Sequence, residues 1–376
     1  MNSIWFYILF GAVALSLLMR AFFALIVFLR AGKSKKTKPI HPEFPPVSVI
    51  IAARNEAENL KRFLPQVLSQ DYSDFEVIVV DDCSLDDSRE TLYEMQKEHD
   101  NLTVSWVPNN AVQRRGKKLA LSIGIKAAKN EWLLFTDADC SPASKNWIQS
   151  MAAHMHENND FVLGYGGYRH EKSVLNSLIR FDTLKIAMRY GGYAGLGHVY
   201  MGVGRNLAYR KSLWVENRGF AGFFQMASGD DDLFVNAYAK SKRTAVCFSA
   251  DGKTESISAY SFSDWKDQKS RHMSTSRYYA AHLRFLLLIE PINQVLSPLL
   301  VALTAFLFWS SIYIYALLSV WLIVKLLEWV VCRSKALLLN EIRLSGKSVF
   351  LDVILPLNYI IFALSGNKKS KRKEWK

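Results

Sequence analysis

Two long apolar stretches limit what this chain of 376 residues can fold into. The first covers the 26 residues from Ile4 to Leu29, and as a helix it would be about 39 Å long, more than the roughly 30 Å hydrocarbon core of a bilayer. No basic residue precedes it and no small-residue cleavage motif follows it, which argues against a cleaved signal peptide. We therefore expect residues 1–30 to be a transmembrane anchor, with Arg20 facing other helices or reaching an interface.

The second stretch, from Leu283 to Val331, predicts two crossings. Its first part, before Glu290, suits a helix in the membrane interface, so residues 281–331 are expected to hold that helix and two transmembrane helices. A last apolar stretch at 349–364 is short for a crossing. We expect residues 332–376 to consist of this amphipathic or re-entrant segment and a basic cytosolic tail.

Positive charge gathers beside these apolar stretches. The chain carries 47 Lys and Arg against 34 Asp and Glu, a net charge of +13. Of this, +5 lies in residues 30–38 and another +5 in residues 367–376. The positive-inside rule places such segments on the cytosolic face, which predicts an integral protein of the bacterial inner (plasma) membrane with a cytosolic catalytic domain. The central domain has no basic patch with interleaved aromatic residues, which argues against nucleic acid as a partner.

A basic, proline-bearing linker at 31–46 leads into residues 47–280, which have the pattern of a soluble α/β domain. Short β-branched runs alternate there with segments of helical periodicity, which predicts a mostly parallel sheet covered on both faces. The strands are expected at 47–53, 75–80, 103–107 and 132–136, and the helices at 56–68, 88–99 and 117–128. In such sheets ligands bind beyond the carboxyl ends of the strands.

Two acidic motifs come directly after predicted strands. Asp81 and Asp82 end the second strand, where a carboxylate can accept hydrogen bonds from the base or ribose of a nucleotide; an Asx-type turn or a helix N-cap explains such a pair equally well. Asp137 and Asp139 end the fourth strand. Because residues two apart in a strand share a face, these two carboxylates are expected to point together and to suit Mg²⁺ or Mn²⁺ held jointly with a diphosphate.

Two further motifs lie later in the domain. Ser228-Gly-Asp-Asp-Asp-Leu233 precedes a helical pattern, and because adjacent carboxylates raise one another's pKa, one of them is a candidate general base. Favourable charge at a helix N-terminus is the alternative interpretation. Gln268-Lys-Ser-Arg-His272 lies shortly before the membrane, where its cations could hold a leaving diphosphate or an anionic lipid head, or could serve topology alone.

Taken together, these motifs resemble the family 2 glycosyltransferases with a GT-A fold, which is the fold of nucleotide-diphospho-sugar transferases. The resemblance is to the membrane branch that includes hyaluronan, chitin, cellulose and poly-N-acetylglucosamine synthases and ceramide glucosyltransferase, and it covers residues 47–279. The motifs that carry it are Val49-Ile-Ile-Ala-Ala-Arg-Asn-Glu-Ala-Glu-Asn-Leu60, Gln70-Asp-Tyr72, Val79-Val-Asp-Asp-Cys-Ser-Leu-Asp86, Gly116-Lys-Lys-Leu-Ala-Leu121, Asp137-Ala-Asp139, Asp230-Asp231 and Gln268-Lys-Ser-Arg271.

The resemblance implies roles in substrate binding for several of the matching residues. Ala53, Arg54 and Glu56 would line the nucleotide pocket, Asp82 with Asp81 would contact uridine, Lys117 would lie near the diphosphate, and Gln268 and Arg271 would contact substrate.

The resemblance also implies the reaction chemistry. Asp139, with Asp137, would hold Mg²⁺ or Mn²⁺. Asp231 would deprotonate the acceptor hydroxyl as it attacks the anomeric carbon, which inverts the configuration in one displacement. Asp230 and Asp232 are the alternatives for this base, and the loop at 204–206 would lie beside the sugar pocket, unless it is a plain turn.

The implied activity is that of a metal-dependent hexosyl- or N-acetylhexosaminyl-transferase of the cell envelope. It would move a sugar from a UDP-linked donor to a lipid, lipid-linked or polysaccharide acceptor at the cytosolic membrane face. The base motif has Asp230 where the family has Glu, and His272 stands where the polymer-forming enzymes have Trp. A processive polysaccharide synthase is therefore kept as the alternative. A non-catalytic nucleotide-sugar-binding membrane protein would be expected to lack the metal or base carboxylates, and both are present.

Overall fold

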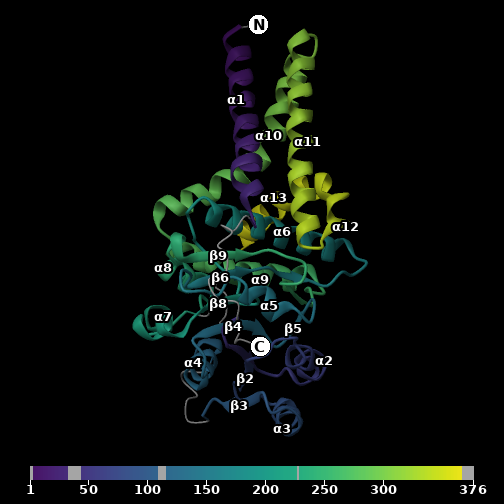
Figure 1. Cartoon of the computed structure of the whole chain (residues 1–376). Helices are drawn as coiled ribbons and strands as arrows, with labels where there is room; N and C mark the ends of the chain where they lie inside the picture. The colour runs from purple at the N-terminus through teal and green to yellow at the C-terminus, as the bar shows by residue number, and fades with distance from the viewer. Residues whose placement is uncertain (1–2, 33–43, 109–115, 227, 366–376) are drawn as a thin grey trace.

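The computed structural model describes residues 3–32, 44–108, 116–226 and 228–365. An α/β domain carries a column of long helices on one side (Figure 1). The basic stretches predicted to face the cytosol lie outside the described residues except at Arg30.

A seven-stranded mixed sheet forms the centre of the domain, with strand order β3-β2-β1-β4-β8-β6-β9. The strands are β1 (Val47–Ala53), β2 (Phe75–Asp81), β3 (Leu102–Trp106), β4 (Trp132–Asp137), β6 (Phe161–Gly164), β8 (Leu207–Arg210) and β9 (Thr244–Cys247). The first four are parallel to one another, and β8 runs antiparallel to both of its neighbours. The mostly parallel α/β sheet expected from the sequence is confirmed.

A second, three-stranded sheet has the order β5-β10-β7 and lies beside the carboxyl end of β4. Its strands are β5 (Cys140–Pro142), β7 (Gly166–Tyr168) and β10 (Thr254–Ser256). Because β10 pairs with β5 in register Ser256 to Cys140, a residue far along the chain is brought next to the acidic motif at 137–139.

Helices cover both faces of the large sheet. On one face α4 (Lys117–Ala127) packs against β1 and β2, and its Gly124 permits the close approach, since a Cβ there would lie 2.8 Å from Ile50. On the other face lie α2 (Ala57–Leu68), α3 (Ser88–Glu98) and α5 (Trp147–Ala152). The buried strand residues alternate between these two cores, as a sheet covered on both faces requires.

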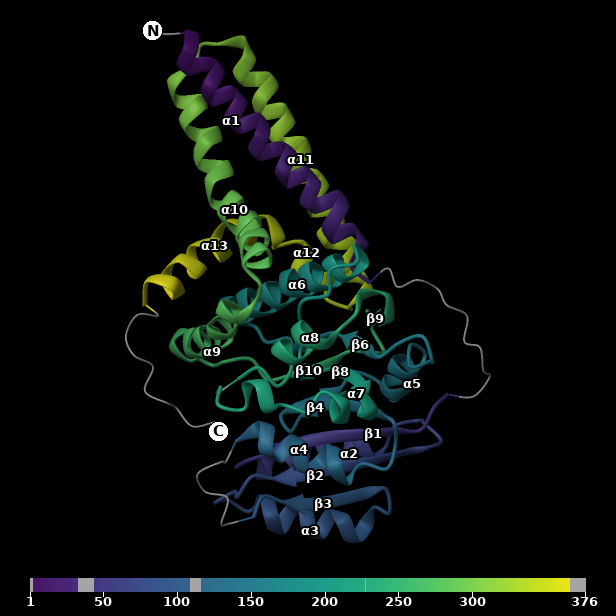
Figure 2. The ribbon, with the colours of Figure 1, turned by 90° about the vertical axis from the view of Figure 1, so that its left-hand side faces the viewer.

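The remaining helices of the domain lie in the second half of its sequence. They are α6 (Val174–Gly195), α7 (Lys211–Glu216), α8 (Asp232–Tyr238) and α9 (Phe262–Thr275). Helix α6 is the longest of them and lies directly beneath the column (Figure 2).

Three helices among the described residues are long and apolar enough to cross a membrane. They are α1 (Ser3–Phe22) continued by η1 (Phe23–Val27) and η2 (Phe28–Arg30), α10 (Ala281–Leu307), and α11 (Ile312–Leu338). The segment before Glu290, expected as an interfacial helix, is continuous with α10. This helix bends along its course (Figures 1 and 2), and it contains Pro291 and Pro298, each of which removes a backbone hydrogen bond.

Two further helices follow the column, α12 (Ile342–Ser345) and α13 (Ser348–Ser365). Helix α13 runs across the base of the column rather than along it (Figure 2). Among residues 348–362, whose side chains the structure describes, the exposed side chains of α13 are all apolar. Asp352 and Tyr359 are half-buried, and Asp352, Asn358 and Tyr359 bond to other parts of the protein or to the helix itself. The exposed residues are Val349, Phe350, Val353, Ile354, Leu357, Ile360 and Ile361. This reversed pattern is that of a helix lying in a membrane interface.

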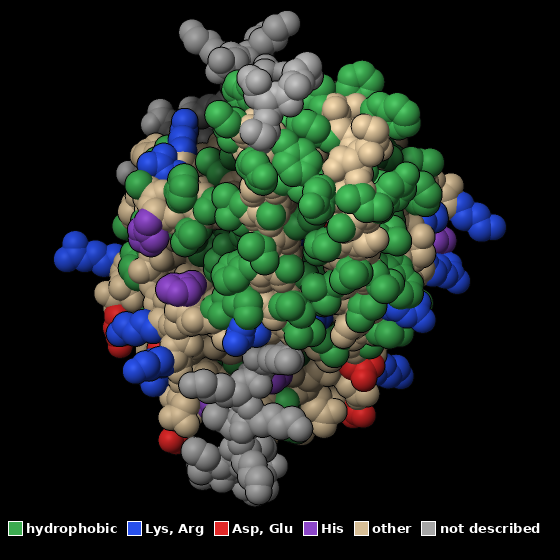
Figure 3. Space-filling model, turned by 90° about the horizontal axis from the view of Figure 1, so that it is seen from above, with side chains coloured by type: hydrophobic (Ala, Val, Ile, Leu, Met, Phe, Trp, Pro, Cys, Tyr) green, Lys and Arg blue, Asp and Glu red, His purple; other side chains and the backbone are tan. Residues whose placement is uncertain are grey.

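The face that carries the column is dominated by hydrophobic side chains, with Lys and Arg around its rim (Figure 3). A water-soluble protein rarely exposes so large an apolar area, whereas a surface in contact with lipid does. The position of α13 on this face is consistent with the interfacial or re-entrant segment expected at 349–364.

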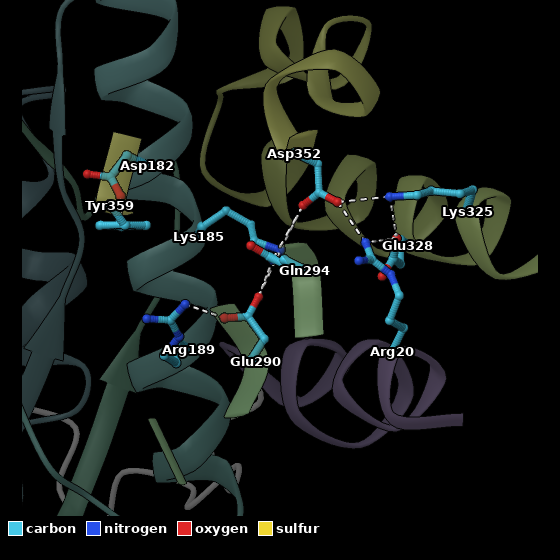
Figure 4. A network of polar contacts seen from close by, with 10 residues as sticks. All are labelled: Arg20, Asp182, Lys185, Arg189, Glu290, Gln294, Lys325, Glu328, Asp352 and Tyr359. Carbon is cyan, nitrogen blue, oxygen red and sulfur yellow. Dashed lines mark hydrogen bonds and ion pairs between the residues drawn. The ribbon is translucent and has the colours of Figure 1, made fainter. Parts of the chain in front are cut away.

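A network of buried ion pairs joins the column to α6 and α13 (Figure 4). Arg20 of α1 contacts Asp352 of α13 at 2.8 Å and Glu328 of α11 at 2.7 Å. Lys185 of α6 lies 3.3 Å from Asp352. The full set of charges is Arg20, Lys185, Arg189, Lys325, Glu290, Glu328 and Asp352. Arg20 therefore faces other helices, and charged side chains inside the apolar segments are accommodated by pairing.

We predict that Asp352→Asn destabilises the protein by about 3–5 kcal/mol, because three buried cations, Arg20, Lys185 and Lys325, lose their shared carboxylate. Thermal unfolding in detergent measures the change. The matched control is Glu94→Gln on α3, an exposed acid that forms no ion pair within the described residues. Equal unfolding temperatures for the two variants would contradict the proposed importance of the network.

Candidate active site

The predicted functional residues converge at the carboxyl ends of three neighbouring strands. The register pairs Ala53 with Asp81 across β1 and β2, and Ala52 with Asp137 across β1 and β4. The two acidic motifs that were expected at strand ends therefore lie along one edge of the sheet, with β1 between them.

Asp81 and Asp82 are both fully buried at the end of β2. The Asp81 carboxylate accepts a hydrogen bond from the backbone N–H of Ser84 at 3.3 Å, which is the Asx-type turn considered for this motif. The backbone N–H of Asp82 donates to the carbonyl of Ala53 at 2.8 Å, so the end of β2 is tied to the end of β1. Of the two, Asp81 carries the turn, and Asp82 lies next to the β1 end.

The loops after β1 and β2 are joined by hydrogen bonds between residues of the two motifs and Ser88. Asn55 has a positive φ of 55°, its N–H donates to the Ser84 hydroxyl at 2.9 Å, and its side-chain oxygen accepts from the Leu85 N–H at 2.8 Å. The N–H of Glu56 donates to the Ser88 hydroxyl at 2.9 Å. These bonds hold the loop after β1 against the loop after β2. Asn and Ser after strand ends are the only sequence signal for them.

Glu56 belongs to the same group of acids as the Asp137-Ala-Asp139 motif. Burial raises the pKa of Glu56 to about 7, and the charges of Asp139 and Asp137 act in the same direction, although a hydrogen bond from Asn59 opposes them. A carboxyl group whose pKa is raised to about 7 beside other acids is typical of a functional site.

Asp137 and Asp139 come together as predicted, but by a turn. Strand β4 ends at Asp137, and residues 138–139 form the turn into β5, so strand alternation is not what aligns the two side chains. Carboxylate oxygens of both residues and the Cys140 sulfur lie within 4.8 Å of one another. Burial raises the pKa of Asp139, and the charge of Asp137 raises it further.

The donor set at this turn fits a hard divalent cation. Two neighbouring carboxylates repel each other, and a cation bound between them stabilises both as anions. The Ser256 hydroxyl of β10 donates to Asp139 at 2.8 Å and orients it. Ser256 had no signal in the sequence, because its place depends on the pairing of β10 with β5.

Lys117 bridges this motif and the second acidic cluster. Its ammonium group lies 2.7 Å from Asp137 and 3.4 Å from Asp230. Burial acts to lower the pKa of Lys117, but the surrounding carboxylates outweigh it and raise the pKa above its usual value. Lys117 is therefore a fixed positive charge at the centre of the site.

Asp230 and Asp231 are adjacent acids with opposite pKa shifts. Although burial acts against it, Lys117 and Lys118 hold the pKa of Asp230 below its usual value. Burial raises the pKa of Asp231 to about 7, and the charges of Asp230 and Asp232 add to the shift. Of these two, Asp231 is the acid suited to take up a proton near neutral pH.

The Asp231 carboxylate is held by two backbone donors. One oxygen accepts from the Gly204 N–H at 2.7 Å and the other from the Asp232 N–H at 2.7 Å, which makes Asp231 the N-cap of α8. Gly204 brings its backbone close, since a Cβ there would lie 3.2 Å from the carboxylate oxygen. Both interpretations of the acidic cluster, helix cap and candidate base, thus apply to the same residue.

The loop at 204–206 is anchored firmly. Asn206 is fully buried, its amide donates to the carbonyls of Tyr165 at 3.0 Å and Gly252 at 2.8 Å, and its oxygen accepts from the Trp147 indole at 3.1 Å. The Arg205 guanidinium lies over the Tyr168 ring at 4.1 Å. The loop is therefore a built part of the site rather than a plain turn.

One small recess is lined by residues of these motifs together with residues of β8. Its lining includes Lys117, Asp137, Gly204, Asp230 and Asp231 of the motifs, and Tyr209 of β8. Lys118, which stands next to Lys117, instead donates to the carbonyls of Met226 and Ser228 at 2.7 Å each and fixes the approach to the acidic cluster.

The two residues predicted on α9 differ in position. The Gln268 amide donates to the Tyr168 hydroxyl at 3.1 Å and so joins the Tyr168–Arg205 stack. Arg271 is exposed and forms no ion pair in the part of the chain that the structure describes. Among the described residues, no contact places Arg271 with the carboxylates of the recess.

Comparisons with known proteins agree with this geometry. Residues 48–216 match the family described as Glycosyl transferase family 2. A poly-beta-1,6-N-acetyl-D-glucosamine synthase of Staphylococcus epidermidis is 35% identical over 108 residues, which is 29% of this chain and 25% of that protein. Glycosyltransferase AglE of Haloferax volcanii is 37% identical over 107 residues, 28% of this chain and 34% of that protein. The chain thus matches a quarter to a third of the length of these relatives.

A solved structure extends the likeness to nearly the whole chain. The mannosyltransferase PcManGT from Pyrobaculum calidifontis, in complex with GDP-Man and Mn²⁺, aligns over 94% of this chain and 97% of its own, with a TM-score of 0.57 and 18% identity. This likeness concerns the fold, and it confirms the fold class expected from the motifs. Residues 48–216 thus match a Glycosyl transferase family 2 domain, the fold is that of its GT-A neighbours, and apolar helices that could span a membrane lie before and after this part of the chain.

Proposed function

We propose that this protein is an inverting, metal-dependent glycosyltransferase. It moves a sugar from a UDP-linked donor to the hydroxyl group of a lipid or lipid-linked acceptor at the cytosolic face of the membrane. The observation that carries the proposal is the recess in which Asp231, with its raised pKa, lies beside Lys117 and the Asp137 carboxylate. A proton acceptor and a cation for the leaving group are thus within one site.

The donor would bind along the strand-end edge of the sheet. Asp82, with Asp81, would contact uridine, and Ala53, Arg54 and Glu56 would line the nucleotide pocket. The burial of both aspartates at the end of β2 and the bonded loops after β1 and β2 support this assignment. The sugar would then lie toward Gly204 and Asp231, with Gln268 and Arg271 of α9 on its acceptor side.

Asp137 and Asp139 would hold Mg²⁺ or Mn²⁺. Their close carboxylates and the Ser256 hydroxyl that orients Asp139 support this role. The bound cation would supply electrostatic stabilisation of the diphosphate as its negative charge develops. Mn²⁺ is the ion bound in the mannosyltransferase that shares the fold.

Asp231 would act as the general base. It would take the proton of the acceptor hydroxyl while the oxygen forms its bond to the anomeric carbon and the bond from that carbon to the diphosphate breaks. Lys117 would stabilise the charge left on the diphosphate, because its ammonium is held in the recess by Asp137 and Asp230. One displacement of this kind inverts the anomeric configuration.

The acceptor would reach the site from the membrane side. Helix α9 leads into α10, and the apolar exposed face of α13 lies at the base of the column, so the domain is held close to a lipid surface. A lipid acceptor could present its hydroxyl to the site while its tail stays in the bilayer. The names of the poly-N-acetylglucosamine synthases favour a second candidate, processive synthesis of a polysaccharide.

A panel of radiolabelled nucleotide sugars, incubated with membranes that contain the protein, tests the proposal. We expect one UDP-sugar to transfer its label into an organic-soluble product. Label in a water-soluble or insoluble polymer would instead establish the processive alternative. Transfer from guanosine-linked donors alone would refute the uridine assignment, and binding without transfer from any donor would favour the non-catalytic interpretation.

We predict that Asp231→Asn lowers the transfer rate by about 10²–10⁴, because the amide cannot accept the proton. Donor affinity should stay within about twofold, since the amide keeps the size of the side chain and the proposed nucleotide contacts are made by other residues, Asp81 and Asp82. Transfer assays and donor titrations measure the two effects. Asp251→Asn in the loop after β9 is an exposed control of the same chemistry and should behave as wild type. Wild-type transfer by Asp231→Asn would exclude it as the base.

We predict that Asp139→Asn weakens Mn²⁺ binding by about tenfold or more, because one of two carboxylate ligands is lost. Electron paramagnetic resonance of free and bound Mn²⁺ measures this without relying on turnover. Asp251→Asn again serves as the control. Unchanged Mn²⁺ affinity in Asp139→Asn would show that the metal binds elsewhere.

A further inference from the structure

The residue after the proposed base has partners of its own. Asp232 is the first residue of α8 and is 8% exposed. One carboxylate oxygen accepts from the Leu233 N–H at 2.8 Å, within its own helix. The other oxygen contacts the hydroxyl groups of Thr275 and Tyr279, the latter at 2.9 Å. An acid in a first helical turn usually faces water, whereas this one is bonded to a distant part of the chain.

Both hydroxyl groups belong to the junction between α9 and α10. Thr275 is the last residue of α9, and Tyr279 stands two residues before α10 begins. Both side chains are buried, whereas their neighbours Ser276 and Tyr278 are exposed. The Tyr279 ring also packs edge-on against Tyr200 at 6.1 Å. The point where the chain leaves the catalytic domain for the apolar column is thus bonded to the start of α8.

Asp232 in turn holds Asp231. Its backbone N–H donates to one oxygen of the Asp231 carboxylate at 2.7 Å, while Gly204 holds the other oxygen. Because these two donors fix the plane of the carboxylate, a shift of Asp232 would turn the group that is proposed to accept the proton.

The same helix α9 is fastened at its middle to the layer beneath the column. Lys269 forms a buried ion pair with Asp182 of α6, and Asp182 also accepts from the Tyr359 hydroxyl of α13 (Figure 4). Helix α9 is therefore bonded both to the interfacial helix and to α8.

We propose that Asp232, Thr275 and Tyr279 form a positioning clamp that ties the α9–α10 junction to α8 and holds the Asp231 carboxylate in the orientation needed for transfer. The inference rests on the proposed role of Asp231 as the base. Thr275 and Tyr279 are positioning residues, because they act through Asp232 and do not line the recess. The orientation of the Asp231 carboxylate depends in this way on the position of the start of α10, the helix proposed to enter the membrane.

Removal of either hydroxyl group tests the clamp in the full-length protein. Tyr279→Phe and Thr275→Val each remove one hydrogen bond to a buried carboxylate while keeping the side-chain volume. We expect kcat to fall about tenfold in each, with the donor dissociation constant unchanged within about twofold. Thr275→Ser, which keeps the hydroxyl group, should restore kcat.

The chain offers a matched control beside each residue. Tyr278→Phe and Ser276→Ala remove the same groups from exposed neighbours that do not contact Asp232, and both should behave as wild type. The unfolding temperatures of all variants separate an effect on positioning from a loss of fold. Tyr279→Phe removes a single oxygen atom, so we expect it to fold even if Thr275→Val does not.

The clamp would be overturned if Tyr279→Phe and Thr275→Val had the same kcat as the controls. It would also be overturned if the donor dissociation constant rose by as large a factor as kcat fell, or if Thr275→Ser were as slow as Thr275→Val. Failure of the proposed function has a different signature. In that case the wild-type protein transfers no sugar, or Asp231→Asn retains activity, whatever the behaviour of Thr275 and Tyr279.

Discussion

The ion pair between Lys117 and Asp137 is the interaction on which the rest of the site depends. The Lys117 ammonium reaches from the first turn of α4 to the end of β4, and it also lies 3.4 Å from Asp230. Three carboxylates can share a buried recess because this cation is among them. The Lys117 charge lowers the pKa of Asp230, whereas the pKa of Asp231 is raised to about 7. Two adjacent aspartates therefore differ in their protonation near neutral pH.

A second set of buried charges joins the domain to the apolar helices that could span a membrane. Lys185 and Arg189 of α6 pair with Glu290 of α10, and the exposed face of α13 is apolar, which reverses the arrangement of a soluble surface. Pairing makes the burial of these charges tolerable, and unpaired they would be costly. The column, α13 and α6 therefore form one bonded layer, and α9 joins that layer to the start of α8.

Much of this organisation follows from local pattern. The first four strands and the three helices between them begin and end within one residue of their predicted ends, because periodicity and turn residues act over short distances. Contacts between distant segments were beyond prediction. Ser256 reaches Asp139 across 117 positions and Tyr279 reaches Asp232 across 47, and both depend on how whole elements pack. Asp137 and Asp139 were paired correctly, although a turn rather than strand alternation brings them together.

The pH dependence of transfer tests most directly whether Asp231 is the base. At subsaturating donor and acceptor, kcat/KM reports the free enzyme, and a base with a raised pKa of about 7 must be ionised to act. We predict that kcat/KM falls about tenfold per pH unit as the pH drops below that value, and that it levels off above it. A profile that stays flat from about pH 5 to about pH 8 would contradict a base titrating near neutrality.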